Sequence, residues 1–229
     1  MVLNGVCMDM ARCRVDYILF IVAMFSIGSA SILVRLSNAS ATTCAFWRLL
    51  LSVPILFLMS VINGVKLRCS YRFLRYFILS GVALALHFIL WMDSLFRIPI
   101  SISTTIVVAY PIHLLLFEAI VLGERPRAKE AIGVAMAFIG IGIFFSDAYT
   151  GIETDLVGVL ESFAASILAA VYFYIGRIAR KALDIYSYTL PTYLFGALTV
   201  AIYSHIFTET NVIEQFTSSW IWLLLLAII

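Results

Sequence analysis

The sequence predicts an all-α fold, a polytopic bundle of helices that crosses a lipid bilayer. Hydrophobic residues make up 63% of the 229 residues and charged residues only 12%, and the mean hydropathy is +1.07. Soluble proteins contain roughly 45–50% apolar and about 25% charged residues. In hydrocarbon only helices and closed barrels satisfy every backbone polar group, and a helix needs about 20 apolar residues to cross. The apolar runs have this helical length, which excludes a soluble domain and a barrel.

Seven apolar runs qualify as complete membrane spans, and an eighth begins near Ser219 and continues to the last residue. Turn signals such as Asn63-Gly64 and the segment 123–126 separate the runs, because Gly, Pro and Asn end helices. We therefore expect seven full spans and part of an eighth. The full spans are residues 17–34, 43–62, 73–95, 100–122, 131–146, 156–176 and 187–207.

Basic residues lie on alternate connections between these runs. The N-terminal segment and the second, fourth and sixth connections hold 12 of the 15 Lys and Arg residues: Arg12, Arg14, Lys66, Arg68, Arg72, Arg75, Arg125, Arg127, Lys129, Arg177, Arg180 and Lys181. The opposite connections carry Asp147, Glu153, Asp155, Glu209 and Glu214. Because Lys and Arg in short loops mark the cytoplasmic side, this pattern predicts a multi-pass protein of the cell membrane with a cytoplasmic N-terminus.

The order of the spans indicates an internal repeat. A shift of 145 residues places the run from Tyr17 on the run from Ser162 and the second span on the seventh. The first unit, residues 17–146, has an odd number of spans, so the second unit, residues 155–229, enters the membrane from the opposite side. Secondary transporters use such inverted repeats to form a substrate site near the bilayer midplane. The second unit lacks counterparts of residues 85–146 and is expected to be incomplete; a chance alignment of apolar helices is the alternative.

Four segments occur in an order typical of a known family. They are residues 46–51 with Pro54, residues 101–105 through Tyr110-Pro111 to the turn 122–125, the pair Gly133 and Gly140, and Asp155 with residues 172–174 and Arg177. Together they resemble the drug/metabolite transporter superfamily, in its EamA-type permease branch, over nearly the whole chain. The resemblance implies two five-helix repeats, ten spans in full, and export or uptake of amino acids, other metabolites or drugs.

Polar side chains inside the spans are candidates for function, because an ionisable group in hydrocarbon costs about 2.5–3.5 kcal/mol or more. Tyr110 and His113 lie near the middle of the fourth span, on one face. His113 is a candidate for substrate binding or proton transfer. His87 and Trp91 share a face of the third span and suit an amphiphilic ligand. The alternatives are a histidine bonded to a neighbouring helix and a tryptophan in the outer aromatic belt.

Two carboxylates add candidates for proton coupling. Glu161 lies six residues inside the sixth span, and Glu118 lies about one turn from the inner end of the fourth span. With His113 they form the set expected to carry protons, although a structural ion pair is the alternative for both carboxylates. Asp93 and Arg97 are spaced for an ion pair at a helix end. The expected substrate pathway comprises His87, Trp91, Tyr110, His113, Glu161 and Tyr172.

Further residues have expected structural roles. Pro111 is expected to kink the fourth span and is a candidate for gating, with a tolerated membrane proline as the alternative. Arg48 matches a residue typical of the resembled family and is expected to be structural, with its side chain reaching outward. Gly133, Gly140 and Gly142 are expected to permit close helix packing.

These observations favour a secondary transporter that moves small metabolites by alternating access. The sequence has no phosphate-cradling glycine loop and no pair of metal-ligand histidines on one helix, so we expect no cofactor, no metal and no catalytic residues. A non-transporting or scaffolding remnant of such a permease and an intramembrane enzyme remain as alternatives. The expected partners are a small-molecule substrate and the lipid bilayer, with a second copy of the chain left open and no nucleic acid.

Overall fold

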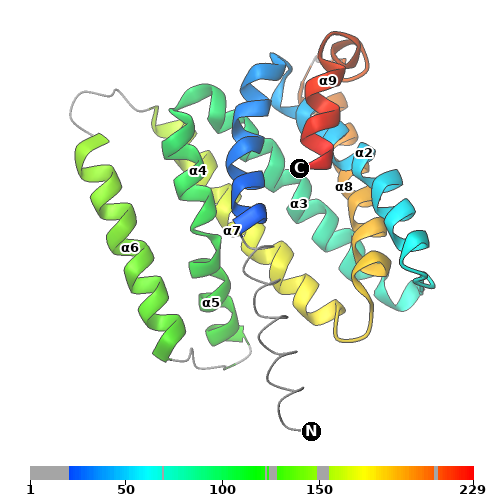
Figure 1. Ribbon diagram of the computed structural model, residues 1–229, viewed down its shortest axis with the longest axis horizontal. Helices are drawn as coiled ribbons and strands as arrows, with labels where there is room; N and C mark the ends of the chain where they lie inside the picture. Colours follow the sequence, from blue (N-terminus) through cyan, green and yellow to red (C-terminus); the bar gives the residue numbers. More distant parts are fainter. Residues whose placement is uncertain (1–20, 69, 122, 124–127, 149–154, 209–210) are drawn as a thin grey trace, which may run out of the picture.

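The chain forms a bundle in which every regular element of the described residues is helical (Figure 1). The computed structural model describes residues 21–68, 70–121, 123, 128–148, 155–208 and 211–229. A first apolar helix, Ile21–Ser37, precedes α2 (Ala41–Ile62), the short 3-10 helix η1 (Tyr71–Phe73), α3 (Leu74–Arg97), α4 (Ile100–Val108), α5 (Tyr110–Val121), α6 (Ala128–Ala148), α7 (Leu156–Ala179), α8 (Ile185–Phe207) and α9 (Glu214–Ile228).

The all-α prediction is confirmed, and each predicted span coincides with helical structure. Five helical segments are long and apolar enough to cross a membrane: Ala41–Ile62, Tyr71–Arg97, Ile100–Val121, Leu156–Ala179 and Ile185–Phe207. The total number of spans stays a prediction. Several predicted features lie outside the described residues: the start of the first span, Arg12, Arg14, Arg125, Arg127, Glu153 and Glu209.

Polar residues cap the starts of α2 and α8, and this explains why both helices begin two residues before the predicted apolar runs. The side chain of Ser40 accepts a hydrogen bond from the backbone N–H of Thr43, and α2 begins two residues before the predicted Thr43. Asp184 accepts from the backbone N–H of Ser187 at the start of α8. Such caps satisfy N–H groups that have no partner within the helix. The turn at Asn63-Gly64 is confirmed, since Gly64 adopts a φ of 65° that suits glycine.

Helix α3 runs through the middle of the bundle (Figure 1), where it packs against α7 and α8. On the right of this view α2 packs against α8 and α9, whereas α4 and α5 pack against α7. Helix α6 lies at the left edge of the bundle. In the most hydrophobic stretch of Tyr71–Arg97, half of the residues are buried inside the bundle. This share is larger than in the other four long apolar segments. Helix α3 is therefore the element around which the others are arranged.

Glycine allows close approach at the contacts of α3. A Cβ added at Gly81 would lie 2.8 Å from both the Thr192 carbonyl oxygen and the Phe195 Cβ of α8. A Cβ added at Gly158 of α7 would lie 2.8 Å from the Arg97 Cβ of α3. The expected role of Gly133 and Gly140 in close packing is wrong for the described atoms, because an added Cβ would meet none of them within 4 Å. These two glycines lie on α6 at the edge of the bundle rather than in its interior. The surroundings of Gly142, named in the same expectation, lie outside the described residues.

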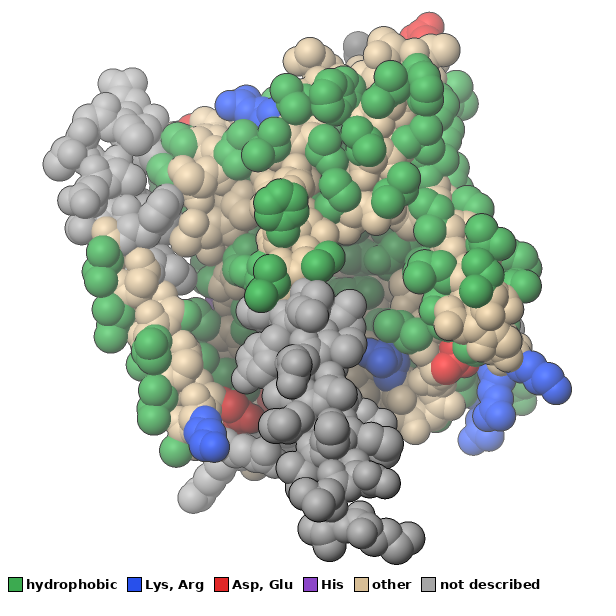
Figure 2. Space-filling view, viewed as in Figure 1, with side chains coloured by type: hydrophobic (Ala, Val, Ile, Leu, Met, Phe, Trp, Pro, Cys, Tyr) green, Lys and Arg blue, Asp and Glu red, His purple; other side chains and the backbone are tan. Residues whose placement is uncertain are grey.

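The outer surface of the bundle is apolar over its middle. Large hydrophobic side chains in the middle of several helices are more than half exposed, including Leu79 at 58%, Met136 at 68%, Ile139 at 62% and Leu198 at 54%. Figure 2 shows hydrophobic side chains across the middle of the visible face and charged ones mainly toward its upper and lower ends. Soluble monomers rarely expose apolar patches above a few hundred Å². This surface is matched to lipid, as expected of a multi-pass membrane protein.

The close contact at Gly81 predicts a stability effect. Gly81→Ala should destabilise the fold by about 1–3 kcal/mol, because the added methyl overpacks the backbone contact with α8. In the control Gly28→Ala the methyl meets nothing within 4 Å, so the helix should gain about 0.5–1 kcal/mol from the lost glycine. Thermal unfolding in detergent micelles measures both effects. Equal midpoints for the two variants would contradict this account of the α3–α8 contact.

Candidate functional site

A cavity of about 300 Å³ lies in the bundle between the first helix, α2, α3, α4, α5, α7 and α8. We call it the central cavity. Apolar and aromatic side chains form most of its wall, and a few polar groups interrupt it. Its lining residues are Ile27, Arg48, Leu84, His87, Phe88, Trp91, Val107, Val108, Tyr110, Ala169, Tyr172, Phe173 and Tyr193. A small, mostly apolar cavity with a few converging polar groups is the usual form of a small-molecule site.

Four residues of the predicted pathway line this cavity together: His87, Trp91, Tyr110 and Tyr172. His87 and Trp91 share a face of α3, as expected, and their rings stack with centroids 6.0 Å apart. The Nδ1 atom of His87 lies 2.8 Å from the Ala165 carbonyl oxygen of α7. A carbonyl only accepts, so this nitrogen carries the proton and the bond fixes the orientation of the ring. Trp91 is 4% exposed, so it belongs to the interior and not to an outer aromatic belt.

Arg48 also lines the central cavity, and the expectation that it reaches outward is wrong. Its Nη1 atom is buried and has no hydrogen-bond partner among the described residues. The guanidinium carbon lies 4.8 Å from the centroid of the Phe88 ring and 5.9 Å from that of Trp91. Helix α2 packs against α3, so these rings of α3 hold the side chain in the interior by cation–π contacts. Its position deep inside an apolar run was the signal in the sequence.

His113 does not line this cavity, although it lies three residues from Tyr110. Its Nδ1 atom is 3.1 Å from the Ser166 Oγ of α7, and its ring meets Phe163 edge-on at 5.2 Å. This is the arrangement of a histidine bonded to a neighbouring helix. The fourth span is also not one helix, because it is interrupted at Ala109 between α4 and α5. Pro111 has no backbone N–H to donate to Val107, which accounts for this interruption; the expected kink and gating role stay predictions.

An aromatic layer separates the central cavity from a second cavity of about 490 Å³, which we call the basic vestibule. Tyr172 and Phe173 line both cavities. The Phe173 ring stacks on Tyr110 with centroids 4.7 Å apart. The vestibule also contains Arg177, Arg180 and Lys181, which belong to the basic connections of the sequence. These rings therefore lie at the boundary between the two cavities.

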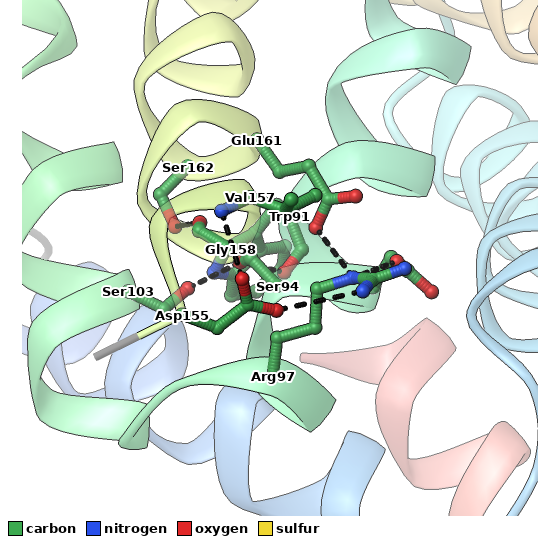
Figure 3. Close-up of polar contacts among 10 residues, drawn as sticks. Trp91, Ser94, Arg97, Ser103, Asp155, Val157, Gly158, Glu161 and Ser162 are labelled. Atoms are coloured by element: carbon green, nitrogen blue, oxygen red, sulfur yellow. Dashed lines mark hydrogen bonds and ion pairs between the residues drawn. The ribbon is translucent and has the colours of Figure 1, made fainter. Parts of the chain in front are cut away.

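An ionic cluster lies at the C-terminal end of α3, around Arg97 (Figure 3). The Nε atom of Arg97 is 2.8 Å from Asp93 Oδ2 and 3.2 Å from Glu161 Oε2, and Nη1 is 3.5 Å from Asp155 Oδ2. The predicted pair of Asp93 and Arg97 is confirmed. Glu161 is therefore in an ion pair outside the central cavity, and it is the least exposed of the four side chains, at 16%.

Glu118 forms an ion pair with Arg177, and its side chain is only 15% exposed. Arg177 follows Phe173 by one turn of α7 and lines the basic vestibule. The pair joins α5 to α7 near the C-terminal end of each helix. This is the structural pairing that was the alternative to a proton-carrying role. Among the described residues no group of three or more His, Cys, Asp or Glu side chains is arranged to hold a metal ion.

Comparison with known proteins adds a family and a fold. A model of the EamA-like transporter family matches residues 15–146. No curated protein sequence matches the chain. One solved structure, titled only as the crystal structure of a protein, has a TM-score of 0.61 and 19% sequence identity, over 90% of this chain and 75% of that chain. At this identity the likeness concerns the fold alone.

Proposed function

This chain belongs to the EamA-like transporter family, and on that premise we propose that it moves a small metabolite, such as an amino acid or a drug, across the membrane by alternating access. The resemblance inferred from the sequence is thereby confirmed. Members of a transporter family need a substrate site that can open to either side. The observation that carries the proposal is the central cavity, which is separated from the basic vestibule by the rings of Tyr172 and Phe173.

The two ends of the bundle support an orientation for this cycle. Arg177, Arg180 and Lys181 line the vestibule, and basic residues near span ends favour the cytoplasmic side. The vestibule would then open to the cytoplasm, and the ionic cluster of Arg97 would face outward. Helices α2 and α8 begin at residues 41 and 185 and end at residues 62 and 207. These ends agree within one residue with the repeat shift, which favours two related units on either side of the site.

Transport by the purified full chain in vesicles is the test of the proposed function. A panel of amino acids, other metabolites and drugs is supplied under imposed gradients, and we expect saturable uptake of at least one of them. Ala169→Trp should abolish this uptake, because Ala169 is a buried wall of the central cavity. Leu198→Trp is the matched control, since Leu198 is 54% exposed on α8. Uptake of no compound, or equal uptake by the two variants, would contradict transport through this cavity.

Glu161 is the group best placed for proton coupling among the three predicted candidates. Glu118 has one basic partner, Arg177, and His113 is bonded to Ser166. Glu161 instead shares Arg97 with Asp93 and Asp155. One guanidinium does not neutralise three carboxylates, so the cluster gains by taking up a proton, and Glu161 is its least exposed member. We therefore propose that protonation of this cluster drives transport.

If Glu161 couples transport to protons, its substitution should impair uptake driven by a pH gradient and spare exchange at equal pH. Glu161→Gln should lower uptake driven by a pH gradient at least about tenfold, because glutamine neither binds nor releases a proton at this position. Exchange of substrate across the membrane at equal pH should persist. Glu118→Gln, in a carboxylate of similar exposure, should retain the gradient-driven mode. If Glu118→Gln loses gradient-driven uptake and Glu161→Gln keeps it, the proton-coupling role belongs to Glu118 and not to Glu161.

Pro111 predicts an effect on rate, because it keeps α4 and α5 as separate segments beside the stacked Tyr110 and Phe173 rings. Pro111→Ala supplies the missing N–H and favours one continuous, stiffer helix. The maximal transport rate should fall several-fold while the apparent affinity stays unchanged. The control is Pro54→Ala, because α2 continues through Pro54 without a break. A variant of Pro111 that transports at the normal rate would exclude a gating role.

A further inference from the structure

Arg48 is a cation inside the membrane region that forms no ion pair with the described residues. It follows the start of α2 at Ala41 by seven residues, or about 10 Å along the helix. One of its nitrogens is buried without a hydrogen-bond partner, and none of the ion pairs among the described residues includes Arg48. An uncompensated charge in such surroundings costs several kcal/mol. A bound ligand could therefore supply the negatively charged group that would pair with the Arg48 guanidinium.

The described residues that line the central cavity supply no other formal charge that would offset this cation. None of its lining residues is an Asp or a Glu. The carboxylates of Asp93, Asp155 and Glu161 are held at Arg97, and that of Glu118 at Arg177. The rings of Phe88 and Trp91 orient the guanidinium without neutralising it. An arginine held in this way presents its planar set of N–H donors, which matches a carboxylate with two parallel hydrogen bonds.

The rest of the wall selects the body of the ligand. Leu84, Val107, Tyr110, Tyr172 and Phe173 supply apolar and aromatic surface. The volume of about 300 Å³ lies at the lower end of the range of about 300–1,000 Å³ for ligand sites. A single guanidinium balances a single negative charge. A second negative charge would be left in the apolar cavity at a large cost.

We propose that the substrate of this transporter is a small monovalent organic anion, with a carboxylate that pairs with Arg48 and an apolar, preferably ring-shaped body that packs on the aromatic wall. This inference rests on the proposed function and names its substrate class. Arg48 is then a binding residue of the site, and its charge, which is in no ion pair with the described residues, is neutralised by the substrate itself.

Matched probes of different charge test the proposal. For each of three rings, phenyl, cyclohexyl and indole, the carboxylate, amide and amine derivatives of the same chain length are compared by calorimetric binding to the full chain in lipid nanodiscs. The carboxylate should bind at least about tenfold more tightly than the amide, because only the carboxylate pairs with the guanidinium. Arg48→Gln should remove this preference, and Arg48→Lys should restore part of it.

The control is Arg75→Gln, because Arg75 is exposed and its guanidinium lies 4.8 Å from the ring centroid of Tyr76, outside the cavity. This variant should keep the preference for carboxylates. Thermal unfolding separates binding from folding: without a partner for its charge, Arg48 should be replaceable by glutamine with an unchanged or higher midpoint. A large fall in the midpoint would indicate a structural ion pair and overturn the proposal.

Two further outcomes separate this inference from the proposed function. The absence of a carboxylate preference in all three ring series, or a preference that survives Arg48→Gln, overturns the substrate class even if vesicles transport an amide or an amine. Carboxylate binding that depends on Arg48, without uptake of the same compound into vesicles, supports the anion site and contradicts transport.

Discussion

The packing of α3 against α7 positions both parts of the site. In lipid the hydrophobic effect does not hold helices together, so close packing of small residues and interhelical hydrogen bonds do. Gly158 of α7 lies against Arg97 and Ile98, and Ala165 of α7 is fully buried and accepts the His87 hydrogen bond. Toward one end this contact forms the wall of the central cavity, and toward the other it brings Glu161 to Arg97. Larger side chains at Gly158 or Ala165 would push α7 away from α3.

The buried polar atoms that lack a hydrogen-bond partner lie in the central cavity and the ionic cluster. Most buried hydroxyls are satisfied within the bundle: Ser94 and Ser103 bond across α3 and α4 at 2.7 Å, and Ser80 bonds to Tyr188. Three buried side-chain atoms of the described residues lack a hydrogen-bond partner, namely Arg48 Nη1, Trp91 Nε1 and Glu161 Oε2. The Glu161 oxygen still has the charge of Arg97 nearby. All three belong to the central cavity or the ionic cluster, and unsatisfied groups are expected at functional sites.

The sequence predicted the helices well because hydrophobic run length and turn residues are local properties. Its errors came from neighbours that the sequence does not reveal. The break of the fourth span at Ala109 is not such an error, because Pro111 and its missing N–H can be read from the sequence. His87 and Trp91 were found because helical spacing places them on one face. The direction of Arg48 depends instead on the rings of α3 beside α2, and the partner of Glu161 lies on another helix. Such contacts are set by tertiary packing.

The two proposals concern opposite charges on two neighbours of α3, since Glu161 lies on α7 and Arg48 lies on α2. His87 and Trp91 meet the cavity, and Asp93 and Arg97 follow within two turns of the same helix. A proton taken up at Glu161 would reduce the attraction between α7 and Arg97 of α3. An anion bound at Arg48 would add a contact between α2 and the cavity wall. Both events would change contacts that α3 makes with its neighbours. Under the two proposals, coupling would need no separate pathway between the sites, because a contact that both ligands bias is sufficient.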